Sequence, residues 1–314
     1  MNEQLNNQLP LKDLENVGLY KEGSITMDRE NINALKRGNM TDLVELKNVK
    51  GNDGFEIEAM AARLSVVDQN GENKLRIDPV YKDVQKHLLL SEKEHEQLVS
   101  GEVANIKKEV IDKEGNAASE IIEFDNLTNQ FLSYDPRKIK IPVAINDETL
   151  SPEKKRKLRE GEVITLSDGT EVQYRTADKN GLRSNRSALV LSLLIDGGLS
   201  YLLFTGINRL MGKQSAEEQS YSKGYLTALK EVEKQLERKQ QKFPNDKSIA
   251  NEINVVKHEF SNASAMSPAQ LDTLKIKDAD DVKNEKNVND PDHGKNNPVG
   301  EDEHDIENSR GRGR

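Results

Sequence analysis

Two motifs in this sequence begin like known catalytic or nucleotide-binding motifs, and both are incomplete. His95-Glu96 starts as a zinc-binding helix does, but the position of the second histidine is occupied by Val99. Gly206 and the pair Gly212-Lys213 imitate a phosphate-binding loop, but their spacing is one residue too long. Gln214 also replaces the Ser or Thr that would hold magnesium. Neither motif therefore supports metal-dependent hydrolysis or nucleotide chemistry.

The other titratable residues form no catalytic or ligand set. The five histidines lack ligand spacing: His87, His95, His258, His293 and His304. Cysteine is absent, which excludes disulfides, thiolate metal sites and a cysteine nucleophile. Asp78-Pro79 and Asp135-Pro136 are better explained as strand ends, because proline stops a hydrogen-bonded ladder. We expect no catalytic residues, no cofactor and no metal, and we predict that the chain is not an enzyme.

Positive charge is concentrated between residues 135 and 190, which hold twelve Lys and Arg against nine Asp and Glu, in a chain of net charge −9. The candidate contacts to nucleic acid or to a partner are Arg137, Lys138, Lys154, Lys155, Arg156, Lys157 and Arg159. A basic stretch over 137–186 can contact phosphates, or it can hold the cytoplasmic side of a membrane segment. A solvated helix face is the simpler alternative.

A repeat predicts the elements that position these residues. Residues 90–103 recur as residues 150–163, with Leu, Ser, Leu, Gly, Glu and Val at matching positions. In each copy a serine can cap the start of a short helix and a glycine can end it. A fainter copy spans residues 27–38, and strands follow each copy. We predict two full helix-plus-meander units and a shortened third over about residues 24–180.

The composition indicates several small cores. Of the 314 residues, 34% are hydrophobic, 4% are aromatic and none is Trp, which excludes a polytopic membrane protein. We predict an α+β fold of five parts. They are an N-terminal helix-plus-meander domain (9–90), a second and a shortened third repeat (91–187), an apolar helical segment (188–211), a helical hairpin (213–262) and a disordered tail (263–314).

Residues 188–207 are apolar and just long enough to span a membrane. Asp196 at their centre opposes insertion into lipid. The alternative is a pair of short apolar helices, broken at Asp196-Gly197-Gly198 and packed on the meanders, which the sequence slightly favours. The first residues lack the features of a secretory signal. We therefore expect a cytoplasmic protein, with a single span in the inner membrane as the alternative.

The helical hairpin is predicted from two apolar stripes spaced four, three and four residues apart, with Pro244-Asn245-Asp246 between them. The stripes are narrow, and the other faces are polar. We expect the pair to form a coiled-coil-like unit that binds a protein partner or a second copy. The contacting residues would be Tyr225, Leu229, Val232, Leu236, Ile249, Ile253, Val256 and Phe260.

Four stretches resemble a family of uncharacterised repeat domains in proteins of Bacteroidetes conjugative and other mobile elements. They are residues 131–138, 158–163, 184–186 and 194–202. Residues 9–90 resemble the family's usual N-terminal companion, so the resemblance covers about residues 9–210. No catalytic residue is established for the family, and related domains joined to topoisomerase-like proteins imply contact with DNA. We expect a non-enzymatic interaction protein of a mobile element; the alternatives are a nucleic-acid-binding accessory protein and a membrane-anchored component.

Overall fold

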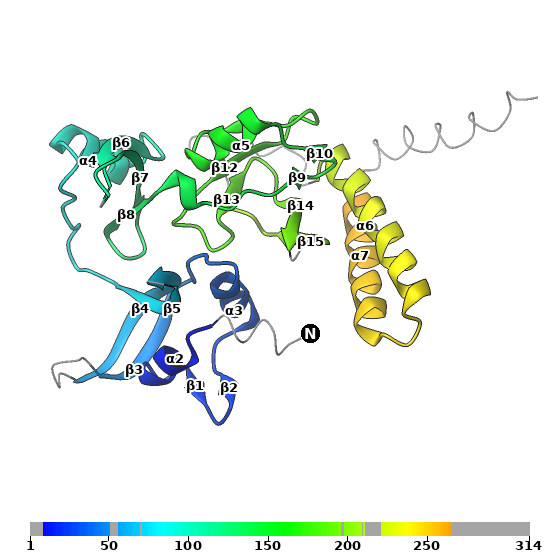
Figure 1. Cartoon of the computed structure of the whole chain (residues 1–314), viewed down its shortest axis with the longest axis horizontal. Helices are drawn as coiled ribbons and strands as arrows, with labels where there is room; N and C mark the ends of the chain where they lie inside the picture. The colour runs from blue at the N-terminus through cyan, green and yellow to red at the C-terminus, as the bar shows by residue number, and fades with distance from the viewer. Residues whose placement is uncertain are drawn as a thin grey trace, which may run out of the picture. The chain divides into compact units, whose positions relative to one another are not determined.

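The computed structural model describes residues 9–50, 56–69, 71–112, 114–195, 198–208, 210 and 221–265 (Figure 1). These residues form short helices and several antiparallel sheets, so the predicted α+β class is confirmed. The helices are α2 (Leu11–Asn16), α3 (Arg29–Lys36), α4 (Glu92–Ser100), the 3-10 turn η1 (Pro136–Lys138), α5 (Pro152–Arg159), α6 (Lys223–Lys242) and α7 (Lys247–Ala265).

The strands pair only in the antiparallel sense among the described residues. They are β1 (Tyr20–Lys21), β2 (Ser24–Ile25), β3 (Val44–Lys50), β4 (Glu56–Gln69), β5 (Glu72–Pro79), β6 (Ile106–Ile111), β7 (Ala117–Asp125), β8 (Gln130–Tyr134), β9 (Ala144–Ile145), β10 (Glu148–Thr149), β11 (Ile164–Thr165), β12 (Glu171–Tyr174), β13 (Leu182–Ser184), β14 (Ala188–Ile195) and β15 (Gly198–Thr205).

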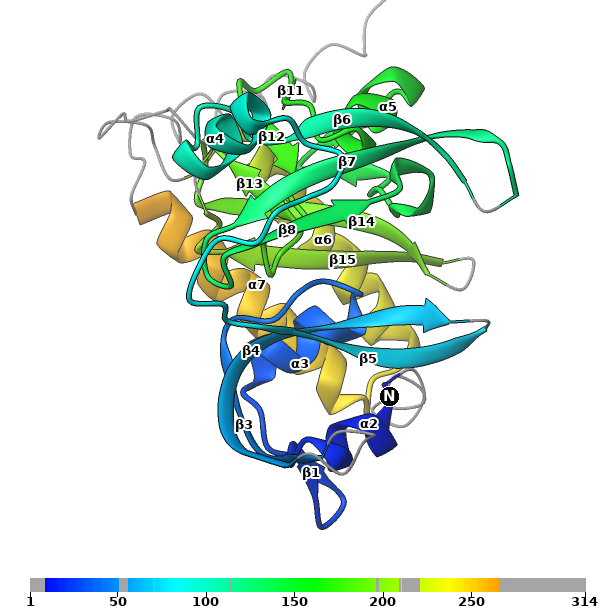
Figure 2. The ribbon, with the colours of Figure 1, turned by 90° about the vertical axis from the view of Figure 1, so that its left-hand side faces the viewer.

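Three helices are each followed by a three-stranded meander: α3 by β3-β4-β5, α4 by β6-β7-β8, and α5 by β11-β12-β13. Figure 2 shows the first two meanders as long ribbons. The sequence predicts a shortened third unit. Its meander does have three strands, but they are shorter than those of the other two meanders. We call these helix-plus-sheet groups units 1, 2 and 3. Their origin by duplication stays a prediction.

The predicted helix caps are confirmed. Ser91 and Ser151 each accept a hydrogen bond from the backbone N–H three residues further along, and Asp28 does the same at the start of α3. A glycine with a left-handed φ follows each helix: 77° at Gly38, 76° at Gly101 and 71° at Gly161. The same start and stop signals therefore place the same short helix before each sheet.

The apolar run at 188–207 is a β-hairpin, so the predicted apolar helical segment is wrong. β14 and β15 pair along their whole length, from Ala188 opposite Thr205 to Ile195 opposite Gly198. Leu189, Leu191 and Phe204 lie in the core of unit 3, whereas Val190 on the other face packs against α6. Because both faces are covered, the strands show no polar alternation, and periodicity cannot distinguish them from a buried helix.

The membrane-spanning helix proposed for the same residues is also wrong, because each strand has only eight residues. Nowhere in the described part of the chain is a helix both long and apolar enough to cross a bilayer. Asp196 and Gly197 lie outside the described residues, as does the cap predicted for Asp196.

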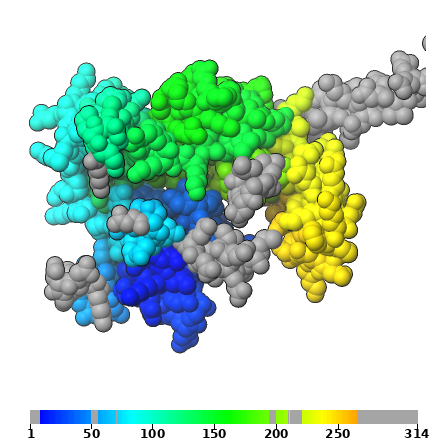
Figure 3. Space-filling view, viewed as in Figure 1, coloured from blue at the N-terminus to red at the C-terminus, as the bar shows by residue number. Residues whose placement is uncertain are grey.

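The helical hairpin is present as α6 and α7, which are joined by a short turn at Pro244. The outer face of α6, yellow in Figure 3, is open to the surface. α7 ends at Ala265, so the predicted start of the tail at residue 263 lies inside this helix. Residues 213–220 of the predicted hairpin and residues 266–314 of the predicted tail lie outside the described residues.

Candidate functional site

The seven basic residues predicted as contacts come from two neighbouring elements. Arg137 and Lys138 lie in η1, and the other five lie on α5. The Nε of Arg159 donates to the carbonyl oxygen of Ile139 at 3.3 Å, which brings the end of α5 next to η1. The structure therefore brings the two groups into neighbouring positions, and we call the seven residues together the α5 surface.

Much of the positive charge on the α5 surface is already paired with carboxylates. Ion pairs join Arg137 to Asp135 at 2.8 Å, Arg156 to Glu160 at 2.6 Å, Lys157 to Glu153 at 3.3 Å and Lys154 to Glu148. The hydrogen bond from Arg137 lowers the pKa of Asp135, which is consistent with a stable pair. Among the described residues, Lys138 and Lys155 have no ion-pair partner.

The residues predicted to meet a partner through the helical hairpin are largely internal. Tyr225, Leu229, Val232, Ile249 and Val256 are at most 4% exposed, and four of these five share one core with Val190 of β14. Leu236 and Phe260 pack at the edge of that core, and Ile253 is half-buried. The apolar surface that covers these stripes is therefore supplied largely by this chain itself.

The turn between β12 and β13, residues 176–181, joins the three units and was missed by sequence reasoning. Lys179 Nζ donates to Glu30 at 2.7 Å and to Asp42 at 2.8 Å in unit 1. The carbonyl oxygen of Lys179 accepts from Asn39 at 3.1 Å and from Arg37 at 3.4 Å. One lysine of unit 3 thus binds unit 1 through both its side chain and its backbone.

Two buried ion pairs support the same junction. Arg63 of unit 1 lies 2.9 Å from Asp125 of unit 2, and both side chains are 2% exposed. Arg175 lies 3.1 Å from Glu123, whose carboxylate also accepts from the backbone N–H groups of Thr176 and Ala177. Burial raises the pKa of Glu123, while Arg175 and the two N–H groups oppose the rise.

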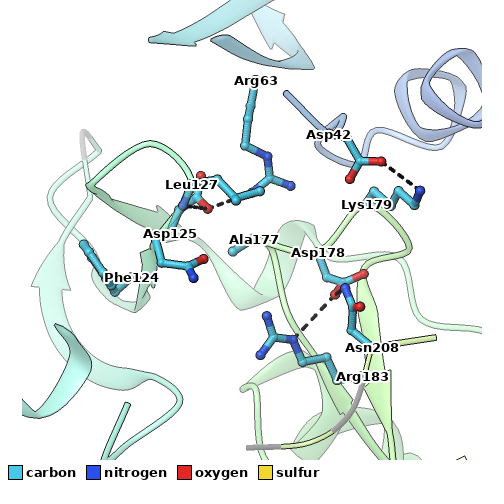
Figure 4. A pocket seen from close by; sticks show the side chains of 11 residues that line it. Asp42, Arg63, Phe124, Asp125, Leu127, Ala177, Asp178, Lys179, Arg183 and Asn208 are labelled. Atoms are coloured by element: carbon cyan, nitrogen blue, oxygen red, sulfur yellow. Dashed lines mark hydrogen bonds and ion pairs between the residues drawn. The ribbon is translucent and has the colours of Figure 1, made fainter. Parts of the chain in front are cut away.

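These contacts surround a cavity of about 380 Å³, which we call the junction pocket (Figure 4). The pocket is lined by Asp42, Arg63, Phe124, Asp125, Asn126, Leu127, Ala177, Asp178, Lys179, Arg183 and Asn208. Asp42 is held by Lys179 and Asp125 by Arg63. Asp178 accepts from Asn208 at 2.7 Å and lies 3.5 Å from Arg183. The lining therefore balances three cations against three carboxylates that are already engaged.

A second polar cluster, which we call the α6 anchor, fixes the start of α6. Asp168 accepts from Ser222 Oγ at 2.6 Å and from Asn146 Nδ2 at 3.3 Å. Asn146 also donates to Ser222 Oγ and accepts from the N–H of Val190, and its φ is 53°. Ser222 caps the helix by accepting from the N–H of Tyr225. The anchor ties two turns and β14 to the helical hairpin.

Acidification is expected to loosen the α6 anchor. Although burial opposes the change, hydrogen bonds from Ser222, Thr170 and Asn146 lower the pKa of Asp168 below its ordinary value of 3.8. The folded-state pKa lies below the unfolded value, so the stabilisation is present above the unfolded pKa and is lost as pH falls through the folded one. The near-UV circular dichroism of Tyr221 and Tyr225, whose ring centres lie 5.4 Å apart, should therefore decrease below about pH 4.

Asp168→Asn is the control for this pH response. The amide cannot titrate, so the variant should lack the acidic step, although its tyrosine signal at neutral pH is already weaker. The same step in wild type and variant would show that another group controls the docking of α6.

Comparison with known proteins gives a match for the N-terminal part of the chain. No curated protein and no solved structure matches the sequence. The matched segment covers α2, α3 and the first meander, and it ends close to the predicted boundary at residue 90. Residues 5–88 form a DUF4099 domain, whose family is described as a protein of unknown function.

Proposed function

We propose that the chain is a non-enzymatic interaction protein of a mobile, conjugative element. The resemblance of residues 9–210 to repeat domains of such elements supports the association. The paired carboxylates of the junction pocket support a structural role for that pocket, because ion pairs hold them in place. A binding protein of this kind needs a surface that remains available to its partner.

The observation that carries the proposal is an apolar surface on the segment between units 1 and 2, which we call the connector surface. Its members are large hydrophobic residues with unusual exposure: Val80 at 43%, Tyr81 at 38%, Leu88 at 101% and Leu89 at 40% on that segment, and Leu127 at 41% on the adjacent turn between β7 and β8. Large apolar side chains left exposed along one short segment are candidates for an interaction site.

The connector surface is held in place by backbone and side-chain hydrogen bonds. The N–H of Tyr81 donates to the carbonyl oxygen of Thr128 at 3.0 Å, and Asn129 Nδ2 donates to the carbonyl oxygen of Tyr81 at 2.7 Å. The N–H of Gln85 donates to the carbonyl oxygen of Asn129. Because its shape is fixed before binding, the surface loses little conformational entropy when a protein partner docks.

Affinity capture from the native host tests this role. The double variant Leu88→Asp/Leu89→Asp should lose the partner, because charge on an apolar contact surface opposes its desolvation. Phe243→Asp is the matched control: Phe243 is 56% exposed at the end of α6, so this variant should retain the partner. Turnover of a nucleotide or cleavage of DNA by the purified protein would contradict the non-enzymatic role.

A second candidate is a nucleic-acid-binding accessory protein that uses the α5 surface. The convergence of η1 and α5 favours it, together with the two lysines that have no carboxylate partner in the described structure. Because Lys154 and Lys157 are paired with carboxylates, Lys138→Ala/Lys155→Ala should weaken binding more than Lys154→Ala/Lys157→Ala does. Gel-shift assays over a salt series measure this. The slope of the logarithm of the binding constant against the logarithm of the salt concentration should become shallower by about 0.9 for each phosphate that the variant no longer neutralises.

Two results would remove the nucleic-acid candidate. One is the absence of a complex even at low salt. The other is binding that does not weaken as salt rises, since phosphate contacts release counterions.

A further inference from the structure

β15 lies at one edge of the sheet β10-β9-β14-β15 in the described part of the chain. The backbone groups on its outer side can be deduced from the bonds of β14. Val143 N–H donates to Ser192 O and Asn146 N–H donates to Val190 O, both at 2.7 Å. The even-numbered residues of β14 therefore direct their backbone groups toward β9, and the odd-numbered residues face β15.

The register then identifies the outward residues of β15. Leu189, Leu191 and Leu193 of β14 stand opposite Phe204, Leu202 and Ser200. Those partners direct their N–H and C=O groups inward, to β14. The alternate residues point their backbone groups outward: Leu199, Tyr201, Leu203 and Thr205.

β15 itself carries none of the side chains that usually block strand pairing, although Arg37 of α3 lies 5.0 Å from the ring centre of Phe204. Residues 198–205 contain no charged residue and no proline, in a chain that is 32% charged. Natural edge strands are blocked by lysines, prolines or bulges, because an open apolar edge templates pairing with another strand. An unprotected edge of eight residues therefore indicates a strand that is paired in the working protein.

The pairing strand must be apolar on both faces. Leu202 and Phe204 pack on the unit 3 core, whereas Tyr201 and Leu203 pack toward α6. Of the segments outside the described structure, residues 211–220 are polar, and Leu274 and Ile276 alternate with lysines to give only one apolar face. β15 itself has the required pattern.

We infer that β15 pairs antiparallel with β15 of a second copy of this chain, which makes one continuous eight-stranded sheet. Equivalent faces stay on the same side only when paired residue numbers have an even sum. With Leu202 opposite Leu202, Tyr201 stands opposite Leu203 and Leu199 opposite Thr205. All four outward residues of each copy are then paired.

Light scattering after size exclusion, on the full chain over a concentration series, tests the inference. A pair of short strands buries less area than a standard interface, so the dimer should form only as concentration rises. Thr205→Lys places charge at an exposed position of the edge, and Tyr201→Pro removes an outward N–H while sparing the β14 ladder. Each should weaken dimerisation by about tenfold or more.

Ala250→Lys, at an exposed position of α7, is the matched charge control and should dimerise like wild type. Far-UV circular dichroism checks that Tyr201→Pro folds; if it does not, Thr205→Lys decides alone. A monomer at every concentration, or a dimer that the folded edge variants leave unchanged, would overturn the inference. Leu88→Asp/Leu89→Asp should leave the dimer intact, which separates this result from the proposed partner binding.

Discussion

Replacing Arg63 with methionine is expected to lower the free energy of unfolding by about 3–5 kcal/mol, the usual cost of leaving one member of a buried ion pair alone. Arg63 is buried; besides its pair with Asp125 it donates through Nε to the carbonyl oxygen of Thr41. Asp78 is also buried close by, and burial raises its pKa. Without Arg63, two buried carboxyl groups would face each other with one fewer cation.

Urea-induced unfolding, followed by far-UV circular dichroism, measures this effect. Lys74→Met is the matched control, because Lys74 also pairs with a carboxylate, that of Glu72, at 2.8 Å, but the two side chains are 42% and 73% exposed. That control should be nearly neutral. Arg63→Met/Asp125→Asn should recover part of the loss, since it removes the unpaired charge. A loss for Arg63→Met no larger than the control's would contradict a stabilising role for the buried pair.

Gly224→Ala is expected to destabilise the docking of α6 by about 1–3 kcal/mol, the cost of overpacking, although alanine usually favours a helix over glycine. A Cβ at position 224 would overlap Asp168 Oδ2 and lie 2.5 Å from Asp147 Oδ1. Asp168 cannot move aside without losing its bonds to Ser222 and Asn146. The substitution therefore reverses the usual sign of a glycine-to-alanine change.

Limited proteolysis of the helical hairpin and urea unfolding together test this expectation. Arg238→Ala, at an exposed position on the same helix, should be nearly neutral. Adding Asp147→Ala to Gly224→Ala should restore part of the stability, because one of the two obstructions is removed. A Gly224→Ala protein as stable as wild type would show that the carboxylates give way without cost.

Local signals predicted the short helices well. The cap at the start of a short helix and the glycine at its end are set by hydrogen bonds within one turn, as at Ser91, which accepts from the N–H of Glu94, and at Gly101. The stripes of the helical hairpin were equally readable, because one apolar face at helical spacing is a local property. The surface against which the stripes pack could not be predicted, because nothing within the helices indicates that β14 supplies it.

The junction pocket could not be predicted from spacing. Arg63, Glu123 and Lys179 lie on three separate segments, and their pairing depends on how the units dock. The failure at 188–207 has a different physical cause, because a hairpin covered on both faces has the same continuous apolar pattern as a buried helix. Asn146 was missed because its role follows from a left-handed turn whose bonds reach β14 and α6.

The hydrogen bonds of Lys179 can form only late in the synthesis of the chain. Asp42 and Lys179 are separated by 137 positions in the chain. At about 5–20 residues per second, translation needs roughly 7–27 s to deliver the lysine after the aspartate. During that interval the DUF4099 domain emerges with the surface around Asp42 and Arg63 uncovered. A nascent chain stalled before residue 176 should accordingly bind chaperones more than one stalled after the full junction has been made.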